Sequence, residues 1–232
     1  MPKKIAILQS NYIPWKGYFD IIDLIDEFVV YDEAQYTKRD WRNRNLIKTK
    51  SGLKWLTIPV QVKGKYKQKI NETRVSDNDW TKKHWKTICY SYSHADYFDQ
   101  YSERFEKAYE VAAGMELLSE INLYFIKFIV EILGIKTEFS QSGQYRLTGN
   151  KSEKIISVCK QAGAYTYVTG PAARSYIDTQ LFKAEGISLV WMDYSGYPQY
   201  KQLFTPFDHK VSIIDLIFNE GTEAKNFLKS IK

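Results

Sequence analysis

The chain has 232 residues, of which 44% are hydrophobic and 26% are charged, a composition typical of a folded protein rather than a disordered one. This length suits one large domain or a core with a small appendage. No run of about 18 apolar residues is uninterrupted, so we expect no membrane insertion. The beginning Met-Pro-Lys-Lys lacks the organisation of a signal peptide, and Cys89 and Cys159 have no CxxC spacing. We therefore expect a reduced, cytoplasmic protein.

The net charge of +6 is unevenly distributed. Residues 38–86 hold fifteen Lys and Arg against four Asp and Glu, a net charge of +11, which leaves −5 for the rest of the chain. Such a segment suits a polyanionic ligand, namely a nucleotide, a nucleotide sugar or RNA. Its aromatic residues, Trp41, Trp55, Tyr66, Trp80 and Trp85, could stack on bases or sugars. The alternative is a solvated basic hairpin that only aids solubility.

The first 59 residues predict a strand, a loop, a helix and a second strand. The apolar run 5–8 indicates a buried strand, the spacing over 18–25 a helix, and the run 28–31 another strand that ends at Asp32. In parallel α/β sheets, ligands bind beyond the carboxyl ends of the strands. The polar segments 9–19 and 32–45, which start where these strands end, are therefore the candidate site.

Further along the chain, residues 52–62 and 70–75 predict a hairpin around the basic turn 63–69. Helices are expected over 80–92, capped by Asn78 or Asp79, and over 100–113 and 116–133. A second α/β half follows, with strands at 137–140, 165–169 and 188–192 and helices at 152–162, 175–184 and 212–218.

This order of elements predicts a Rossmann-like α/β fold, a mostly parallel sheet flanked by helices. A small basic β-hairpin insertion and a helical segment lie in its middle. We expect a single domain over 1–232, with core halves at about 1–62 and 135–232 and the hairpin and helical insertion at about 63–134.

Lys16-Gly17-Tyr18 stands between the first strand and the first helix. Free amides at a helix N-terminus bind anions, and a glycine lets a ligand approach the backbone closely. The layout is analogous to the HIGH-type strand–loop–helix of nucleotidyl-transferases, with Tyr18 in place of the histidine. An ordinary tight turn is the alternative.

Three residues are candidates for catalysis. Asp32, at a strand end, is a candidate general base, and Lys38 can act as a point charge or, if desolvated, as a base. His84 is another candidate acid or base, although a lone histidine in a helix is more often structural. Glu33, next to Asp32, is expected to point to the opposite face. With no clustered His and Cys spacing, no metal site is expected.

Other polar and aromatic residues of the same segments, and of a later turn-rich segment, are candidates for substrate binding. Among them, Arg44 can bind a phosphate or a carboxylate with both arms of its guanidinium group. The alternative is a set of structural polar loops. The full set is Gln9, Tyr12, Trp15, Lys16, Gly17, Tyr18, Gln35, Tyr36, Trp41, Asn43, Arg44, Asn45, Tyr200 and Gln202.

Taken together, these motifs resemble the WbqC-like protein family over nearly the whole chain. The resemblance is carried by Gln9-x-x-Tyr12-x-Pro14-Trp15-x-Gly17-Tyr18-Phe19, Tyr31-Asp32-x-x-Gln35-Tyr36-x-Lys38-x-x-Trp41-x-Asn43-Arg44-Asn45, Tyr197-Pro-x-Tyr-x-Gln202 and Ser212-Ile-Ile-Asp215. Some members have Gln-Pro where this chain has Gln9-Ser10, and Asp-Asp where it has Asp32-Glu33. The second difference argues against a metal site built on paired aspartates.

The resemblance implies a role in bacterial O-antigen or surface-polysaccharide biosynthesis. The implied reaction is the transfer of an acyl or aminoacyl group, for example glycyl, to the amine of a nucleotide-linked amino sugar. The activated donor would be an aminoacyl-tRNA, an acyl carrier protein or an acyl-CoA. Asp32 or His84 would take the proton, and a backbone amide at Gly17-Tyr18 would stabilise the oxyanion. Lys38 and Arg44 would hold the phosphates or an acyl carboxylate, and Trp15 and Trp41 would stack on the sugar or the base.

Two other functions stay open at this point. The first is an ATP-dependent nucleotidyl-transferase or acyl-adenylating enzyme with a degenerate HIGH-like loop, which would need magnesium and release pyrophosphate. The second is a non-catalytic module that binds nucleotide sugars or RNA, which would show a steep salt dependence and no turnover.

Overall fold

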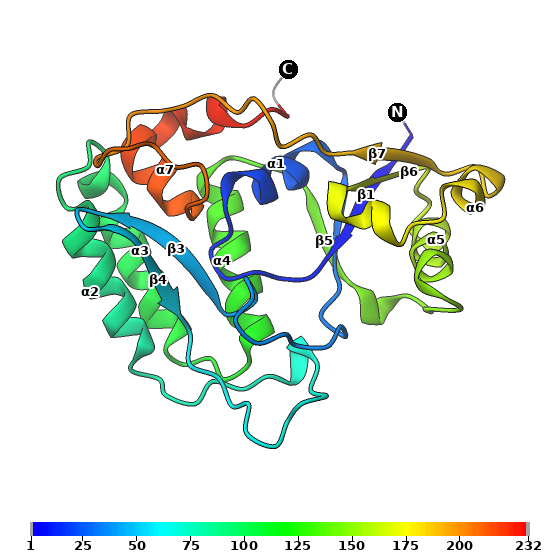
Figure 1. Ribbon diagram of the computed structural model, residues 1–232, viewed down its shortest axis with the longest axis horizontal. Helices are drawn as coiled ribbons and strands as arrows, with labels where there is room; N and C mark the ends of the chain where they lie inside the picture. Colours follow the sequence, from blue (N-terminus) through cyan, green and yellow to red (C-terminus); the bar gives the residue numbers. More distant parts are fainter. Residues whose placement is uncertain (1, 231–232) are drawn as a thin grey trace.

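The computed structural model describes residues 2–230 and is built around one parallel sheet (Figure 1). Its five strands follow the order β5-β2-β1-β6-β7, and every neighbouring pair is parallel. The predicted α/β fold with a parallel sheet is therefore confirmed. The strands are β1 Lys4–Leu8, β2 Glu27–Val30, β5 Glu138–Gln141, β6 Thr166–Thr169 and β7 Ser188–Trp191.

Helices cover both faces of this sheet because its central strands are apolar on both sides. Ala6 and Phe28 belong to the larger apolar cluster, which includes α1 (Lys16–Leu24). Their neighbours Ile5 and Val29 belong to a second cluster on the other face, with α5 (Lys151–Gln161) and α6 (Thr179–Ala184). The chain order reverses between β1 and β6, the kind of position where such folds bind ligands.

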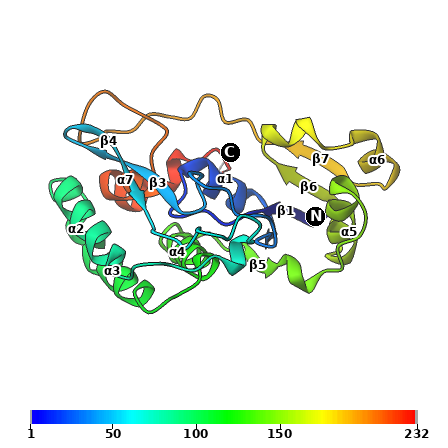
Figure 2. The same ribbon diagram turned by 60° about the horizontal axis from the view of Figure 1, so that its bottom comes forward.

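The segment between β2 and β5 forms a second body of structure beside the sheet (Figure 2). It contains the helices α2 (Trp80–Tyr92), α3 (Phe98–Ala112) and α4 (Leu118–Ile132) and an antiparallel hairpin of β3 (Arg44–Thr49) and β4 (Gly52–Thr57). The hairpin packs against α2 and against α7 (Ile213–Glu220). Short 3-10 turns complete the fold at Ile70–Glu72, Ser142–Gln144, Pro171–Ser175 and Gly221–Phe227.

The hairpin differs from the predicted one. Residues 52–57 pair with 44–49, whereas 70–75 contact the end of the expected strand only through an isolated bridge between Val60 and Val75. The residue pattern over 44–49 does not indicate a strand, because one of its buried residues is the amide Asn45. That side chain donates hydrogen bonds to the backbone of the loop after β1 instead of packing in an apolar core.

Three helix ends also bear on the sequence predictions. Asp79, one of the two predicted alternatives, is the N-cap residue of α2, but its side chain makes no capping hydrogen bond. The helix predicted over 175–184 begins only at Thr179, where Asp178 accepts hydrogen bonds from the backbone amides of Gln180 and Leu181. Ser212 caps α7, where its side chain accepts a hydrogen bond from the backbone amide of Ile214. No helix within the described range is long and apolar enough to cross a membrane.

Candidate functional site

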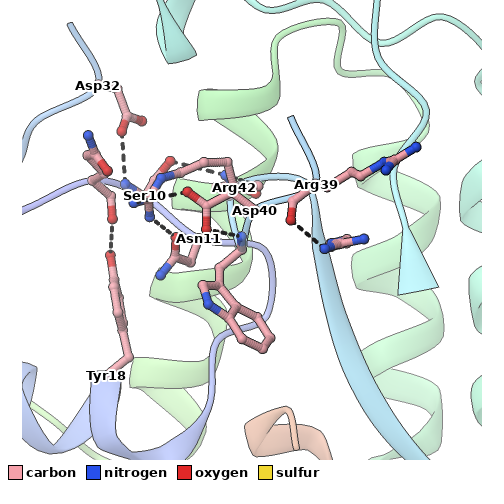
Figure 3. Close-up of polar contacts among 11 residues, drawn as sticks. Ser10, Asn11, Tyr18, Asp32, Arg39, Asp40 and Arg42 are labelled. Atoms are coloured by element: carbon pink, nitrogen blue, oxygen red, sulfur yellow. Dashed lines mark hydrogen bonds and ion pairs between the residues drawn. The ribbon is translucent and has the colours of Figure 1, made fainter. Parts of the chain in front are cut away.

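Asp32 lies just beyond the carboxyl end of β2 and faces the loop that follows β1 (Figure 3). The backbone amide of Ser10 donates a hydrogen bond of 2.8 Å to its Oδ1 atom. The residue is only 6% exposed, and its Oδ2 atom is buried, yet this atom has no hydrogen-bond partner among residues 2–230. Burial raises the pKa of Asp32, against the opposing effects of the Ser10 hydrogen bond and the Arg42 charge. A carboxylate held at one oxygen and free at the other can act as a general base.

Polar side chains that the sequence analysis missed hold this arrangement in place. Asn122 of α4 is fully buried and donates to Ser10 Oγ at 3.1 Å and to the carbonyl of Arg42 at 2.8 Å. The Arg42 guanidinium group donates in turn to Oδ1 of Asn11. The sequence feature that indicates this contact is Asn122 itself, because an amide inside an otherwise apolar helix needs a polar partner. α4 therefore joins the loops after β1 and β2 into one unit.

A small pocket of about 70 Å³ lies beside Asp32, at the carboxyl ends of β2 and β5. Glu33 lines it as well, and its Oε2 atom accepts a hydrogen bond from Ser142 Oγ on the β5 side of β2, whereas Asp32 is held by Ser10 on the β1 side. The pocket is lined by Val30, Asp32, Glu33, Asn71, Ser119, Glu120, Leu123 and Gln141.

An exposed aromatic platform, formed by Trp41, Trp55 and Arg44, flanks the loop after β1. The two indole rings lie 5.4 Å apart and are 43% and 41% exposed. The Arg44 guanidinium group lies 4.0 Å from the Trp55 ring, and it also donates to the carbonyl of Arg39. The Tyr12 amide donates to the Trp41 carbonyl at 3.1 Å, which fixes the platform to the loop. Flat exposed rings beside a cation suit a nucleobase and its phosphates.

The other candidates between residues 35 and 45 differ in their surroundings. Lys38 is exposed and forms no ion pair within the described part of the chain. The side chain of Gln35 donates to the Tyr66 carbonyl at 2.8 Å, whereas Tyr36 is buried and its pKa is raised by burial to about 12. Asn43 is buried and donates to the carbonyl of Ile58. Gln35 and Lys38 are both exposed, but the side chain of Gln35 is held by Tyr66.

Asn45 holds the loop after β1 through hydrogen bonds to its backbone. Its side-chain amide donates to the carbonyls of Tyr12 and Ile13, at 3.1 and 3.0 Å. Ser212 Oγ donates to the same Ile13 carbonyl at 2.7 Å. Ile13 has a φ angle of 36°, a backbone conformation that costs a branched residue energy. Asn45 and Ser212 therefore stabilise an unusual loop conformation between β1 and α1.

His84 lies in a buried chain of hydrogen bonds with Tyr12 and Tyr109. The Tyr12 hydroxyl is 2.9 Å from His84 Nδ1 and 2.7 Å from the Tyr109 hydroxyl, and His84 Nε2 is 3.2 Å from the Thr57 carbonyl. Because a carbonyl can only accept, Nε2 carries the proton and Nδ1 accepts from Tyr12. Burial lowers the pKa of His84 to about 4. Both ring nitrogens are thus occupied, which is typical of a structural histidine.

Lys16 and Gly17 are covered in this structure. The Lys16 ammonium group donates to the Pro198 carbonyl at 3.0 Å, and the residue is only 3% exposed. Burial lowers its pKa to about 8. The Trp15 ring lies over Gly17, where an added Cβ would come within 2.3 Å of it. The amide of Tyr18 already donates to the Trp15 carbonyl at 3.0 Å. An anion at this helix end would need Trp15 to move.

Tyr200 and Gln202 surround a different carboxylate, Asp215 of α7. The Tyr200 hydroxyl and the Gln202 amide donate to Asp215 Oδ1 at 2.6 and 2.9 Å, and the Tyr92 hydroxyl donates to Oδ2 at 2.9 Å. Asp215 is fully buried. Tyr200 also lies 5.2 Å from the Lys16 ammonium group, measured to its ring centre. These candidates therefore form a buried network rather than part of the Asp32 group.

The remaining two candidates form one contact beside Asp32. The Tyr18 hydroxyl donates to the carbonyl of Gln9 at 3.0 Å, as Figure 3 shows.

Across residues 2–230, no three His, Cys, Asp or Glu side chains gather as a group able to hold a metal ion. The site thus consists of one buried carboxylate, two arginines and an aromatic platform at the carboxyl ends of β1 and β2.

This combination defines a Rossmann-like α/β protein with a polar site at the carboxyl edge of its sheet. The chain belongs to the WbqC-like protein family, whose sequence model matches residues 9–227. It is similar to a Mycobacterium tuberculosis (strain ATCC 25618 / H37Rv) protein described as uncharacterized protein Rv1507c. The two are 48% identical over 227 residues, which cover 98% of each chain. No solved structure matches this chain.

Proposed function

We propose that this protein transfers an acyl or aminoacyl group to the amine of a nucleotide-linked amino sugar, a step in the synthesis of bacterial surface polysaccharide. The observation that carries the proposal is the free, buried Oδ2 atom of Asp32 beside a small pocket. Membership of the WbqC-like family supports the polysaccharide context.

In the proposed reaction, Asp32 takes one proton from the substrate ammonium group and leaves a neutral amine. The nitrogen lone pair of this amine attacks the acyl carbonyl carbon of an ester or thioester donor. The bond from that carbon to the donor oxygen or sulfur then breaks, and the departing atom takes the proton held by Asp32. The nitrogen, which still carries two hydrogens and a positive charge, gives its second proton to the freed Asp32 carboxylate, which passes it to solvent and leaves a neutral amide. The raised pKa of Asp32 favours the first step, since a stronger base takes a proton more readily.

The same site has groups suited to the nucleotide part of the substrate. A base could stack on Trp41 or Trp55, and Arg44, Arg42 and Lys38 could bind the diphosphate. The net charge of +11 over residues 38–86 supports an anionic ligand on this side. An aminoacyl-tRNA, an acyl carrier protein or an acyl-CoA would supply the activated acyl group.

The proposal is tested by mixing the purified protein with dTDP- or UDP-linked amino sugars and each of the three donor classes. Thermal unfolding identifies the nucleotide sugar that stabilises the protein, and mass spectrometry then detects the acylated product. We expect acylation of the amino sugar with one donor class. Pyrophosphate release with ATP and magnesium, or salt-dependent RNA binding without turnover, would replace this proposal by one of the two other functions.

A further inference from the structure

The pocket beside Asp32 carries a charge opposite to that of the protein as a whole. Three acidic residues line it, namely Asp32, Glu33 and Glu120, and no Lys or Arg of the described residues does. The whole chain has a net charge of +6, with +11 over residues 38–86. We call this feature the acidic pocket.

A second observation points to a ligand in the acidic pocket. Asp32 is more than nine-tenths buried, yet its Oδ2 atom has no hydrogen-bond partner among residues 2–230. A buried acceptor without a partner is costly, and a carboxylate in this state favours a charged donor. A bound cation with N–H groups would supply that donor.

The size and composition of the pocket favour a small organic cation. A volume of about 70 Å³ holds a group of only a few heavy atoms. Asn71, Gln141 and Ser119 also line the pocket, and side chains of these types can accept from a donor with three N–H bonds. The carboxyl groups do not form a metal-binding cluster in the part of the chain that the structure describes.

We infer that the acidic pocket binds the protonated primary amine of the acceptor sugar and so selects amino sugars over the matched sugars that carry a hydroxyl group. This inference rests on the proposed function. The polyanionic end of such a ligand would face the basic segment, and its ammonium end would face Asp32. The two oppositely charged regions thus match a ligand with a nucleoside diphosphate at one end and an ammonium group at the other.

Calorimetric binding of two probes tests the inference without turnover. The probes are a dTDP-linked amino sugar and the matched dTDP sugar with a hydroxyl group in place of the amine. Glu120→Gln removes one charge from an exposed residue of the pocket. Glu110→Gln, which removes a charge from an exposed position of α3 outside the pocket, is the matched control.

The wild-type protein should bind the amino sugar more tightly than the hydroxyl sugar. Glu120→Gln should weaken amino-sugar binding by roughly threefold, the effect of one partly exposed charge, and leave the hydroxyl sugar unaffected. Glu110→Gln should change neither affinity.

Equal binding of both sugars, or an equal loss for both in Glu120→Gln, overturns the subsite even where acyl transfer occurs. Selective amine binding with no acyl transfer from any donor keeps the subsite and overturns the proposed function. Binding of neither probe overturns both.

Discussion

The backbone amide of Ser10 and the Oδ1 atom of Asp32 are joined by a hydrogen bond of 2.8 Å across two neighbouring strands. The strand register explains this contact, since Leu8 pairs with Val30 and each polar residue follows its strand by two positions. The pairing of β1 with β2 therefore fixes the orientation of the carboxylate. The oxygen that the amide does not hold is buried and has no hydrogen-bond partner among residues 2–230, and Asp32 lines the pocket.

Replacing Trp41 by Ala should weaken the binding of a nucleotide sugar. Stacking of a base on an aromatic ring contributes about 1–3 kcal/mol, so we expect roughly a tenfold loss of affinity or more. Trp41→Phe should keep most of it. Tyr165→Ala removes an exposed ring that directly precedes β6, away from the platform, and should leave the affinity unchanged. Calorimetric titration of the three variants measures these effects, and an equal loss in Trp41→Ala and Tyr165→Ala would argue against a stacking role.

The buried His84 should make the free energy of unfolding depend on pH. Its folded-state pKa of about 4 lies below the ordinary value of 6.5, so between these values the unfolded chain binds more protons and stability falls as the pH is lowered. Because of His84, the free energy of unfolding should fall by about 2 kcal/mol between about pH 7 and about pH 5.

Urea unfolding at both pH values, on the wild type and on two variants, measures the contribution of His84. His84→Gln should lose this part of the pH dependence, whereas His94→Gln, which changes an exposed histidine, should keep it. Equal pH dependence in the wild type and in His84→Gln would show that His84 is not buried in its neutral form.

Replacing Asp215 by Asn should destabilise the fold. Its Oδ1 atom accepts from Tyr200 and Gln202 and its Oδ2 atom from Tyr92, so an amide whose oxygen takes the Oδ1 place would set an NH2 group against the Tyr92 hydroxyl that donates there. The expected loss is about 2–4 kcal/mol in the free energy of unfolding. Asp79→Asn, at a helix start where the side chain makes no cap, should stay within about 0.5 kcal/mol of the wild type. Similar losses in both variants would contradict the structural role given to Asp215.

The sequence predicts the sheet well because its strands are short apolar runs between turns. Residues 5–8 and 28–31 were recognised from this pattern, and β1 and β2 lie there. β3 was missed because Asn45 occupies an inward position, where its side chain binds a loop that lies more than thirty residues away in the chain. A local pattern cannot indicate such a partner.

Local patterns can indicate candidate site residues but not the contacts that hold them. Asp32, Trp41 and Arg44 were named because of residue type and position after a strand. Asn122 was not, since 112 positions separate it from Ser10, and only the packing of α4 brings the two side chains together. The burial of His84 likewise depends on contacts with Tyr12 and Tyr109, which come from distant parts of the chain.

The most direct test of the account is the acyl-transfer rate of Asp32→Asn. The amide can keep the hydrogen bond from Ser10 through its oxygen, but it cannot accept a proton from the substrate. We predict that kcat falls by about a hundredfold or more, with thermal unfolding close to that of the wild type, while Asp79→Asn keeps full turnover. A folded Asp32→Asn protein with the turnover of the wild type would contradict the assignment of Asp32 as the general base.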